Sequence, residues 1–393
     1  MGKLSFSAWL ALLGCVALLT GGCTDPYLPD AISAPPNYLV VDGFLNSQGV
    51  TTIRLSRTYA IGAKTTPPAE TKATVQIEEQ AGGRFALREG AAGTYTSAPL
   101  VLNPARKYRL YLKTLAGKEY ASDFVPVKTT PVIDNVRWRT TNAGLDILVN
   151  AHDDTNATQY YRWEYDETWE ITPLYQPNIE YAGGRIRDIV VPYPTVCWGN
   201  ARSTIIQIDK TTGLSRDVVT DFRVRQLATT SSLLNTRYSV LVQQHALTKE
   251  EFGYWELLRK NTESIGTLFD PQPVQLTGNV RCLNNESDLA LGYVGAHSVT
   301  EKRLFIRRQE LPSTWFVQTG YETCLPPDSV FIDRPSPPPP NPAVILQGAF
   351  SSGAYLPIEA ILNKQASIIG YTAKSRDCID CRTRGTAVKP SFW

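Results

Sequence analysis

The segment Tyr160–Ile171 reads YYRWEYDETWEI, and its apolar and polar side chains alternate. Tyr161, Trp163 and Tyr165 occupy one set of alternate positions, whereas charged residues fill most of the other set. Successive side chains of a β-strand point to opposite faces of the sheet, so this pattern predicts a strand with one buried face and one polar face. On the apolar side, Glu167 is the one charged residue. The chain is therefore expected to be built around half-buried strands.

The same alternation appears earlier, in Lys107–Lys113, and short runs of β-branched and aromatic residues separated by turn residues begin at Tyr38. These runs predict an immunoglobulin-like β-sandwich over residues 38–130. Proline and threonine interrupt the strand pattern at Thr129–Pro131, and a new series begins at Ile133. The overall prediction is a mainly β protein with two tandem β-sandwich domains.

The second predicted domain covers residues 131–312, and its strand pattern is similar to that of a fibronectin-type-III-like sandwich. It carries a long irregular insertion, Pro173–Asn200, of the kind in which binding sites tend to lie. A capping box at Thr248–Glu251 predicts a helix that continues to about Asn261. Three apolar side chains recur at helical spacing and either pack this helix on the sandwich or line a ligand groove: Phe252, Trp255 and Leu258.

The last part of the chain, residues 313–393, is predicted to be a proline-rich loop followed by a cysteine-containing segment. The run Asp333–Pro342 is mostly proline and is expected to be an extended surface loop.

The first residues predict export and a lipid anchor. Lys3 precedes an apolar run, Leu4–Thr20, that has the form of a secretory signal and is short for a membrane-spanning helix. Small residues directly before Cys23 resemble the lipobox of bacterial lipoproteins, so residues 1–22 are expected to be a signal peptide and Cys23 to be acylated. A competing lipobox ends at Cys15, and an ordinary unmodified Cys23 is the other alternative. Residues 23–37 are rich in proline and are expected to form a tether.

The charge balance excludes one large class of partners. Lys and Arg total 39 against 37 for Asp and Glu, a formal net charge of +2. Proteins that bind the phosphate backbone of nucleic acids normally carry a clear basic excess. The expected partner is instead a membrane, reached through the N-terminal lipid, because several acyl chains give a stable anchor.

Five cysteines remain after the lipobox, and in an oxidising cell envelope they are disulfide candidates: Cys197, Cys282, Cys324, Cys378 and Cys381. One possible bridge joins Cys197 to Cys282, and Cys324 would pair with Cys378 or Cys381. The Cys378-x-x-Cys381 spacing also fits a redox motif or half of a zinc site. A zinc site needs two further ligands, and the sequence offers no second such pair, so no metal is predicted.

Nothing in the sequence predicts catalysis or a cofactor. The three histidines, His152, His245 and His297, are far apart in sequence. His152-Asp153-Asp154 is open to a metal or acid–base interpretation, but Asp153 and the residues after it are typical of an exposed turn. The common catalytic and nucleotide-binding motifs are absent, so the protein is expected not to be an enzyme.

Several short motifs together resemble a domain-of-unknown-function family of Bacteroidota outer-membrane lipoproteins. They are Asp25-Pro26-Tyr27, Tyr38–Gly43, Tyr160–Trp163, Cys197-Trp198, Gly278–Cys282, Gly292-Tyr293, Asp377–Cys381 and Pro390–Trp393. Members of that family are commonly encoded beside TonB-dependent receptors.

The resemblance implies an outer-membrane, lipid-anchored accessory protein that binds, without catalysis, as the partner of a TonB-dependent receptor in nutrient uptake. The expected binding surfaces are the Pro173–Asn200 insertion and the disulfide-linked C-terminal tail. One alternative is a structural or adhesion module of the cell envelope. Another is a surface hydrolase, which would place several carboxylates in one cleft.

Overall fold

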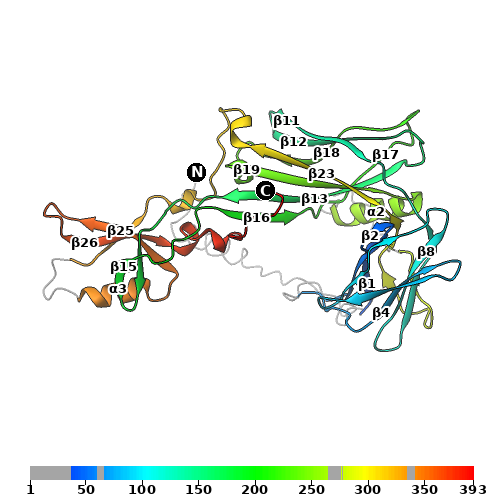
Figure 1. Ribbon diagram of the computed structural model, residues 1–393, viewed down its shortest axis with the longest axis horizontal. Helices are drawn as coiled ribbons and strands as arrows, with labels where there is room; N and C mark the ends of the chain where they lie inside the picture. The colour runs from blue at the N-terminus through cyan, green and yellow to red at the C-terminus, as the bar shows by residue number, and fades with distance from the viewer. Residues whose placement is uncertain (1–36, 60–65, 264–275, 277, 334–340) are drawn as a thin grey trace, which may run out of the picture.

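The computed structural model describes residues 37–59, 66–263, 276, 278–333 and 341–393. Within these residues the chain is mainly β, as predicted, and forms an N-terminal sheet, a central sandwich and a small distal module (Figure 1). The expected signal peptide, Cys15, the acylated Cys23 and the tether up to residue 36 lie outside the described residues, as do residues 334–340 of the proline-rich run.

In the described part of the chain, no helix is long and apolar enough to cross a membrane.

The N-terminal sheet is one path of strands that folds around a single core. Its order is β20-β9-β8-β4-β5-β6-β3-β1-β21, and an isolated bridge between Arg281 and Leu289 joins the two ends of the path. Leu39, Ile53 and Tyr95 are fully buried in its core. The strands predicted from Tyr38 to Lys113 are all present, but they follow this one path rather than two separate sheets. The bounds are β1 (Leu39–Asn46), β3 (Thr52–Arg57), β4 (Thr74–Glu79), β5 (Arg84–Glu89), β6 (Thr94–Ser97), β8 (Lys107–Lys113), β9 (Glu119–Ser122), β10 (Val125–Pro126), β20 (Val280–Cys282), β21 (Ala290–Leu291) and β22 (Ala296–His297), with a short ribbon of β2 (Gln48–Gly49) and β7 (Leu100–Val101).

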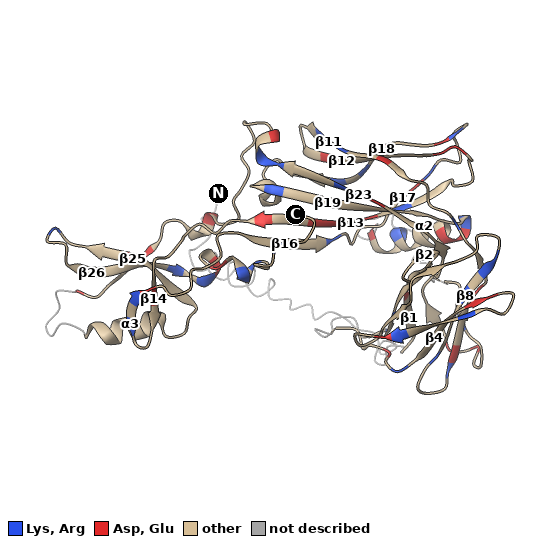
Figure 2. Cartoon of the chain, in the orientation of Figure 1, with Lys and Arg blue, Asp and Glu red and all other residues tan. Residues whose placement is uncertain are grey.

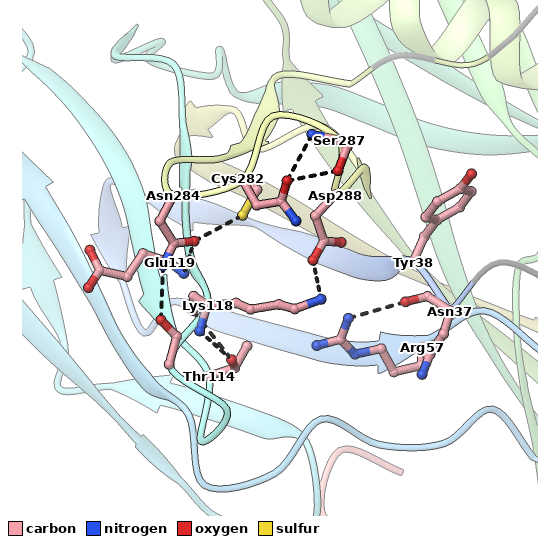
Figure 3. Close-up of polar contacts among 12 residues, drawn as sticks. Asn37, Tyr38, Arg57, Thr114, Lys118, Glu119, Cys282, Asn284, Ser287 and Asp288 are labelled. Atoms are coloured by element: carbon pink, nitrogen blue, oxygen red, sulfur yellow. Dashed lines mark hydrogen bonds and ion pairs between the residues drawn. The ribbon is translucent and has the colours of Figure 1, made fainter.

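Residues 278–297 pair with the N-terminal sheet, although the sequence placed them in the second domain, residues 131–312. The predicted domain assignment of this segment is therefore corrected. Strand β20 pairs with β9, whereas β21 and β22 pair in parallel with β1. Side chains join the loop between β20 and β21 to the β8–β9 turn. Lys118 binds Asp288 (Figure 3), and Asn284 Nδ2 donates to the Gly117 carbonyl at 3.0 Å. The sequence pattern did not predict this pairing because strands of two or three residues are too short for their periodicity to indicate their partners.

The central sandwich has two sheets, with the order β11-β12-β18 in one and β16-β13-β19-β23 in the other. This arrangement confirms the predicted fibronectin-type-III-like sandwich. The short strand β17 (Gln207–Lys210) also pairs with β13. The other strands are β11 (Ile133–Thr141), β12 (Gly144–Asp153), β13 (Tyr160–Ile171), β16 (Cys197–Arg202), β18 (Asp217–Leu227), β19 (Arg237–Ala246) and β23 (Val299–Arg307).

Strand β13 supplies the centre of the sandwich core, as its alternation predicted. Trp163 is fully buried, stacks on Phe222 with ring centroids 4.3 Å apart, and donates to Gln244 Oε1 at 2.9 Å. Glu167, the charged residue on the apolar side, is also buried, and its Oε1 accepts from Arg225 Nε at 2.9 Å and from Tyr238 at 2.5 Å. A buried carboxylate is tolerated when such partners satisfy it.

Helix α2 (Lys249–Glu263) lies where the capping box predicted it. Thr248 Oγ1 accepts from the Glu251 backbone N–H at 3.1 Å, which satisfies one free amide of the first turn. Phe252 is buried against Tyr160 and Ile208 and packs the helix on the sandwich. Trp255 packs against the same cluster. Trp255 and Leu258 also line a cavity.

Gly292 joins the return segment to β1, and we expect Gly292→Ala to lower the free energy of unfolding by about 2–3 kcal/mol. Its φ is +126°, and a Cβ there would lie 2.0 Å from the Val41 carbonyl oxygen. The matched control is Gly253→Ala in α2, where a Cβ meets nothing within 4 Å. Helix propensity predicts no loss for that control. Urea unfolding of both variants tests this, and equal midpoints would contradict it.

The distal module was not predicted: the sequence indicated only loops for Pro173–Asn200 and residues 313–393. A hairpin, β14 (Ile179–Ala182) and β15 (Arg185–Asp188), packs with helix α3 (Pro342–Phe350) on the sheet β24-β26-β25 (Figure 1). Asn341 caps α3 by accepting from the Ala343 N–H at 2.9 Å. The sheet strands are β24 (Asp328–Phe331), β25 (Tyr355–Leu362) and β26 (Ile368–Ser375). Two segments far apart in sequence thus share one small core.

Two disulfides lie at the junction of the sandwich and the distal module. Cys197 pairs with Cys381, and Cys324 pairs with Cys378. The suggested Cys197–Cys282 bridge is therefore wrong, and Cys378-x-x-Cys381 is neither a redox pair nor half of a zinc site, because each of its cysteines bonds elsewhere. Cys282 is a buried free thiol, 3.3 Å from Asn284 Oδ1 (Figure 3).

Trp393, the last residue, packs against the central sandwich. Trp393 Nε1 donates to Glu170 at 2.8 Å, and the Arg237 guanidinium lies 4.9 Å from the Trp393 ring centroid.

Candidate functional site

A cavity of about 820 Å³ lies between the N-terminal sheet and the central sandwich, and we refer to it as the interdomain cleft. Strands β1 and β3 form one wall, the outer face of β13, β19 and β23 forms the second, and α2 forms the third. Its volume is in the range of small-molecule sites, which occur preferentially at domain interfaces.

The β-sandwich wall carries the polar face of Tyr160–Ile171. Arg162 lies opposite His245 across the β13–β19 pair, and Glu164 lies opposite Gln243. Charged residues recur along β13 (Figure 2). The alternation that placed Trp163 in the core therefore also placed these side chains in the cleft.

Arg162 and Glu164 form the centre of this wall. Arg162 Nη1 donates to Glu164 Oε1 at 2.5 Å, and Arg202 Nη2 donates to Glu164 Oε2 at 3.1 Å. Burial opposes ionisation of Glu164, but the two guanidinium groups outweigh it and hold its pKa below the ordinary value. The Arg162 guanidinium also lies over the Trp255 ring, 4.2 Å from the centroid.

Two imidazoles meet deeper in the cleft region. The rings of His245 and His297 lie 5.1 Å apart, and Phe44 of β1 stacks on His297 at 4.2 Å. His297 Nε2 lies 3.6 Å from Glu251 Oε1, from the first turn of α2. Gly295 leaves room for that carboxylate, since a Cβ there would lie 2.1 Å from Glu251 Oε2. Both histidines and Glu251 are buried.

Several buried nitrogens of these walls have no hydrogen-bond partner among the described residues. They are both ring nitrogens of His245, Nε2 of His297, Nε of Arg162 and Nε1 of Trp255. A buried polar atom without a partner costs about 1–3 kcal/mol, and such atoms are few in folded proteins. Arg162, His245 and Trp255, which lie on β13, β19 and α2, all line one cavity, and this concentration marks the cleft as the candidate functional site.

Protonation of His245 is expected to destabilise the folded chain at acidic pH. Burial lowers the pKa of His245 well below the ordinary value of 6.5, and the charge of Arg162 acts in the same direction. The unfolded chain therefore binds a proton that the folded chain does not. The contribution of neutral His245 to the free energy of unfolding is complete above pH 6.5. Below pH 6.5 this contribution decreases by at most about 1.4 kcal/mol per pH unit. Urea unfolding at pH 7.5, 6.5 and 5.5 should show a weaker loss in His245→Gln than in the parent.

His152 provides the matched control for that measurement. It is exposed, and its hydrogen bond with Asp134 raises its pKa above 6.5. Its contribution therefore has the opposite sign: it is present below pH 6.5 and is lost as the pH rises through the raised pKa. His152→Gln should therefore lose at least as much stability below pH 6.5 as the parent does. If His245→Gln loses as much stability between pH 6.5 and pH 5.5 as the parent, the lowered pKa of His245 is contradicted.

His152 and Asp153 are the last residues of β12, and the turn that the sequence favours follows at Asp154 and Thr155. Asp153 accepts from the N–H groups of Thr155 at 2.9 Å and Thr158 at 2.9 Å. This turn does not line the cleft. One group among the described residues has the spacing of metal ligands, Cys324 with Asp377 and Cys378, but its two sulfurs are joined in a disulfide.

The expected binding surfaces do not line the cleft either. The Pro173–Asn200 insertion packs in the distal module and ends in the disulfide of Cys197. A second cavity, of about 660 Å³, lies beside the free thiol of Cys282 and is lined by Arg281, Glu286 and Asp288. The cleft was not predictable from the sequence because its walls come from separated segments. The local signals were the polar face of Tyr160–Ile171 and the helical spacing of Trp255 and Leu258.

The fold and site define a multi-part β protein with a polar cleft between two of its parts. The chain belongs to the family described as domain of unknown function (DUF4249), whose model matches residues 24–303. This match covers the N-terminal sheet and the central sandwich with its cleft, and it ends before most of the distal module. Comparison with curated proteins gives no match.

Proposed function

We propose that this chain is a lipid-anchored outer-membrane protein that binds a ligand, without catalysis, as the partner of a TonB-dependent receptor in nutrient uptake. Acyl chains on Cys23 would hold it at the membrane. The resemblance to Bacteroidota lipoproteins encoded beside such receptors supports the location and the partner. The observation that carries the binding role is the interdomain cleft, in which unpartnered buried nitrogens surround a cavity of about 820 Å³.

The arrangement of the cleft carboxylates favours binding over hydrolysis. A hydrolase that uses paired carboxylates needs one protonated acid opposite an ionised base. Glu164 is held ionised by Arg162 and Arg202. Glu251 lies beside His297, and Glu301 Oε1 accepts from Gln243 Nε2 at 2.6 Å. Each carboxylate is thus held by a neighbouring side chain, which gives a rigid polar wall.

A structural or adhesion role is the second candidate, and the distal module favours it. Large apolar side chains are exposed there, among them Val344, Leu362 and Ile368. Exposed apolar groups that gather on one part of a protein often mark a contact surface.

Affinity purification from detergent-solubilised membranes tests the first role. The expected result is enrichment of one TonB-dependent receptor with the tagged full-length protein, and not with an equally tagged, unrelated lipoprotein. Recovery of the protein alone would contradict the proposal. Deletion of the gene separates the two candidates: uptake of one nutrient should fail under the first, and attachment or surface integrity under the second.

A further inference from the structure

We propose that the interdomain cleft binds a neutral saccharide, and that His245 and Trp255 provide hydrogen bonds to its hydroxyl groups. This inference deepens the proposed function, on which it rests, by naming the class of ligand.

The first argument is charge. Most charged groups that line the cleft already have a partner: Arg162 and Arg202 pair with Glu164, Arg54 lies 3.7 Å from Asp42, and Glu301 accepts from Gln243 at 2.6 Å. An ionic ligand would have to compete with these pairs for its own partner. A neutral ligand leaves them intact, and it can use the atoms that remain.

The second argument is the kind of polar atom that remains. Trp255 Nε1 and Arg162 Nε each carry one N–H and need an acceptor. His245 is 2% exposed, and both of its ring nitrogens lack a partner. A neutral imidazole has one nitrogen that donates and one that accepts, so it needs both an acceptor and a donor. A hydroxyl group is both.

The third argument is the apolar part of the walls. Phe44, Tyr254 and Tyr293 also line the cleft. Burial raises the pKa of both tyrosines to about 12, so both are neutral at physiological pH. A pyranose ring has flat faces of C–H groups, which can lie on aromatic rings while its hydroxyls bind at the edge. A short peptide also combines donors and acceptors, but its charged termini would compete with groups that are already paired in the cleft.

The unpartnered nitrogens are covered in this structure, so binding must turn the His245 and Trp255 rings toward the cavity or move α2 away from β1. Trp255 packs against the Arg162 guanidinium, and this contact would change. Ligand binding is therefore expected to alter tryptophan fluorescence as well as to raise the unfolding temperature.

Screening of the full-length protein, purified in detergent, against an array of neutral mono- to tetrasaccharides tests the inference. Uronic acids and N-acetylated tripeptide amides serve as comparison probes. We expect a neutral saccharide to bind, with calorimetric affinity weakened at least about tenfold in Trp255→Phe and in His245→Gln, because each loses a hydrogen bond. Trp198→Phe is the matched control, since Trp198 Nε1 is also buried and unpartnered but lies outside the cleft. Its affinity should not change.

Binding of no neutral saccharide, preferential binding of the uronic acids or the peptide amides, or equal affinity in the cleft variants and the control would each overturn the inference. Thermal unfolding shows whether each variant is folded. If either Trp255→Phe or His245→Gln does not fold, the affinity of the other cleft variant decides the test. If the receptor co-purifies but no saccharide binds, the ligand class is wrong and the proposed function stands. If a saccharide binds but no receptor co-purifies, the proposed partner is wrong and the ligand class stands.

Discussion

Replacing Cys197 and Cys381 together by alanine is expected to lower the free energy of unfolding by about 3–5 kcal/mol. The bridge joins residues separated by 184 positions, and both cysteines are fully buried. A cross-link over so long a loop removes much of the conformational freedom of the unfolded chain. The pair also fixes the C-terminal segment to the start of β16, so its loss should expose residues 382–393 to proteases. Urea unfolding without reductant and limited proteolysis measure both effects.

Cys282→Ala is the control for that experiment. Cys282 is buried but forms no disulfide, so this variant loses a small side chain and no cross-link, and about 1 kcal/mol is expected. Peptide mapping of the oxidised protein supplies an independent check. Recovery of a Cys197–Cys282 peptide, or an unfolding midpoint for the double variant equal to that of Cys282→Ala, would contradict the pairing.

Replacing Cys23 by alanine is expected to move the protein from the membrane fraction to the soluble fraction. In the proposed function, the anchor is the set of acyl chains on Cys23. A stable anchor needs two or more chains, so the loss of all of them should release almost all of the protein. Fractionation with immunoblotting measures the release, and mass spectrometry of the N-terminal peptide detects the lipid.

Cys15→Ala separates the two lipobox alternatives. If residues 1–22 are the signal peptide, this substitution lies in a segment that is removed, and the mature protein should stay in the membrane fraction. Release by Cys15→Ala together with retention by Cys23→Ala would show that processing occurs at Cys15. An unmodified Cys23 in the mature protein would contradict the anchor itself.

The longer strands of the central sandwich were predictable because each of them is long enough to show its period, whereas β16 falls largely in the segment predicted to be an irregular insertion. Apolar and polar side chains alternate along most of Tyr160–Ile171, so its apolar face and its polar face could be read directly. The start of α2 was predictable for a similar reason, since Thr248 and Glu251 make a local motif. Glu167 broke the pattern, and its partners Arg225 and Tyr238 lie on other strands, which no local pattern reveals.

The sequence by itself determined the mainly β class, the two-faced strand β13, the capped helix and the set of cysteines available for pairing, because each of these depends on neighbouring residues. Only the tertiary structure decided which cysteines meet, why residues 278–297 return to the first sheet, and how Arg162, His245 and Trp255 come to surround one cavity. Those contacts join segments tens to hundreds of residues apart. They are set by packing between sheets, where the local period says which face is buried but not what covers it.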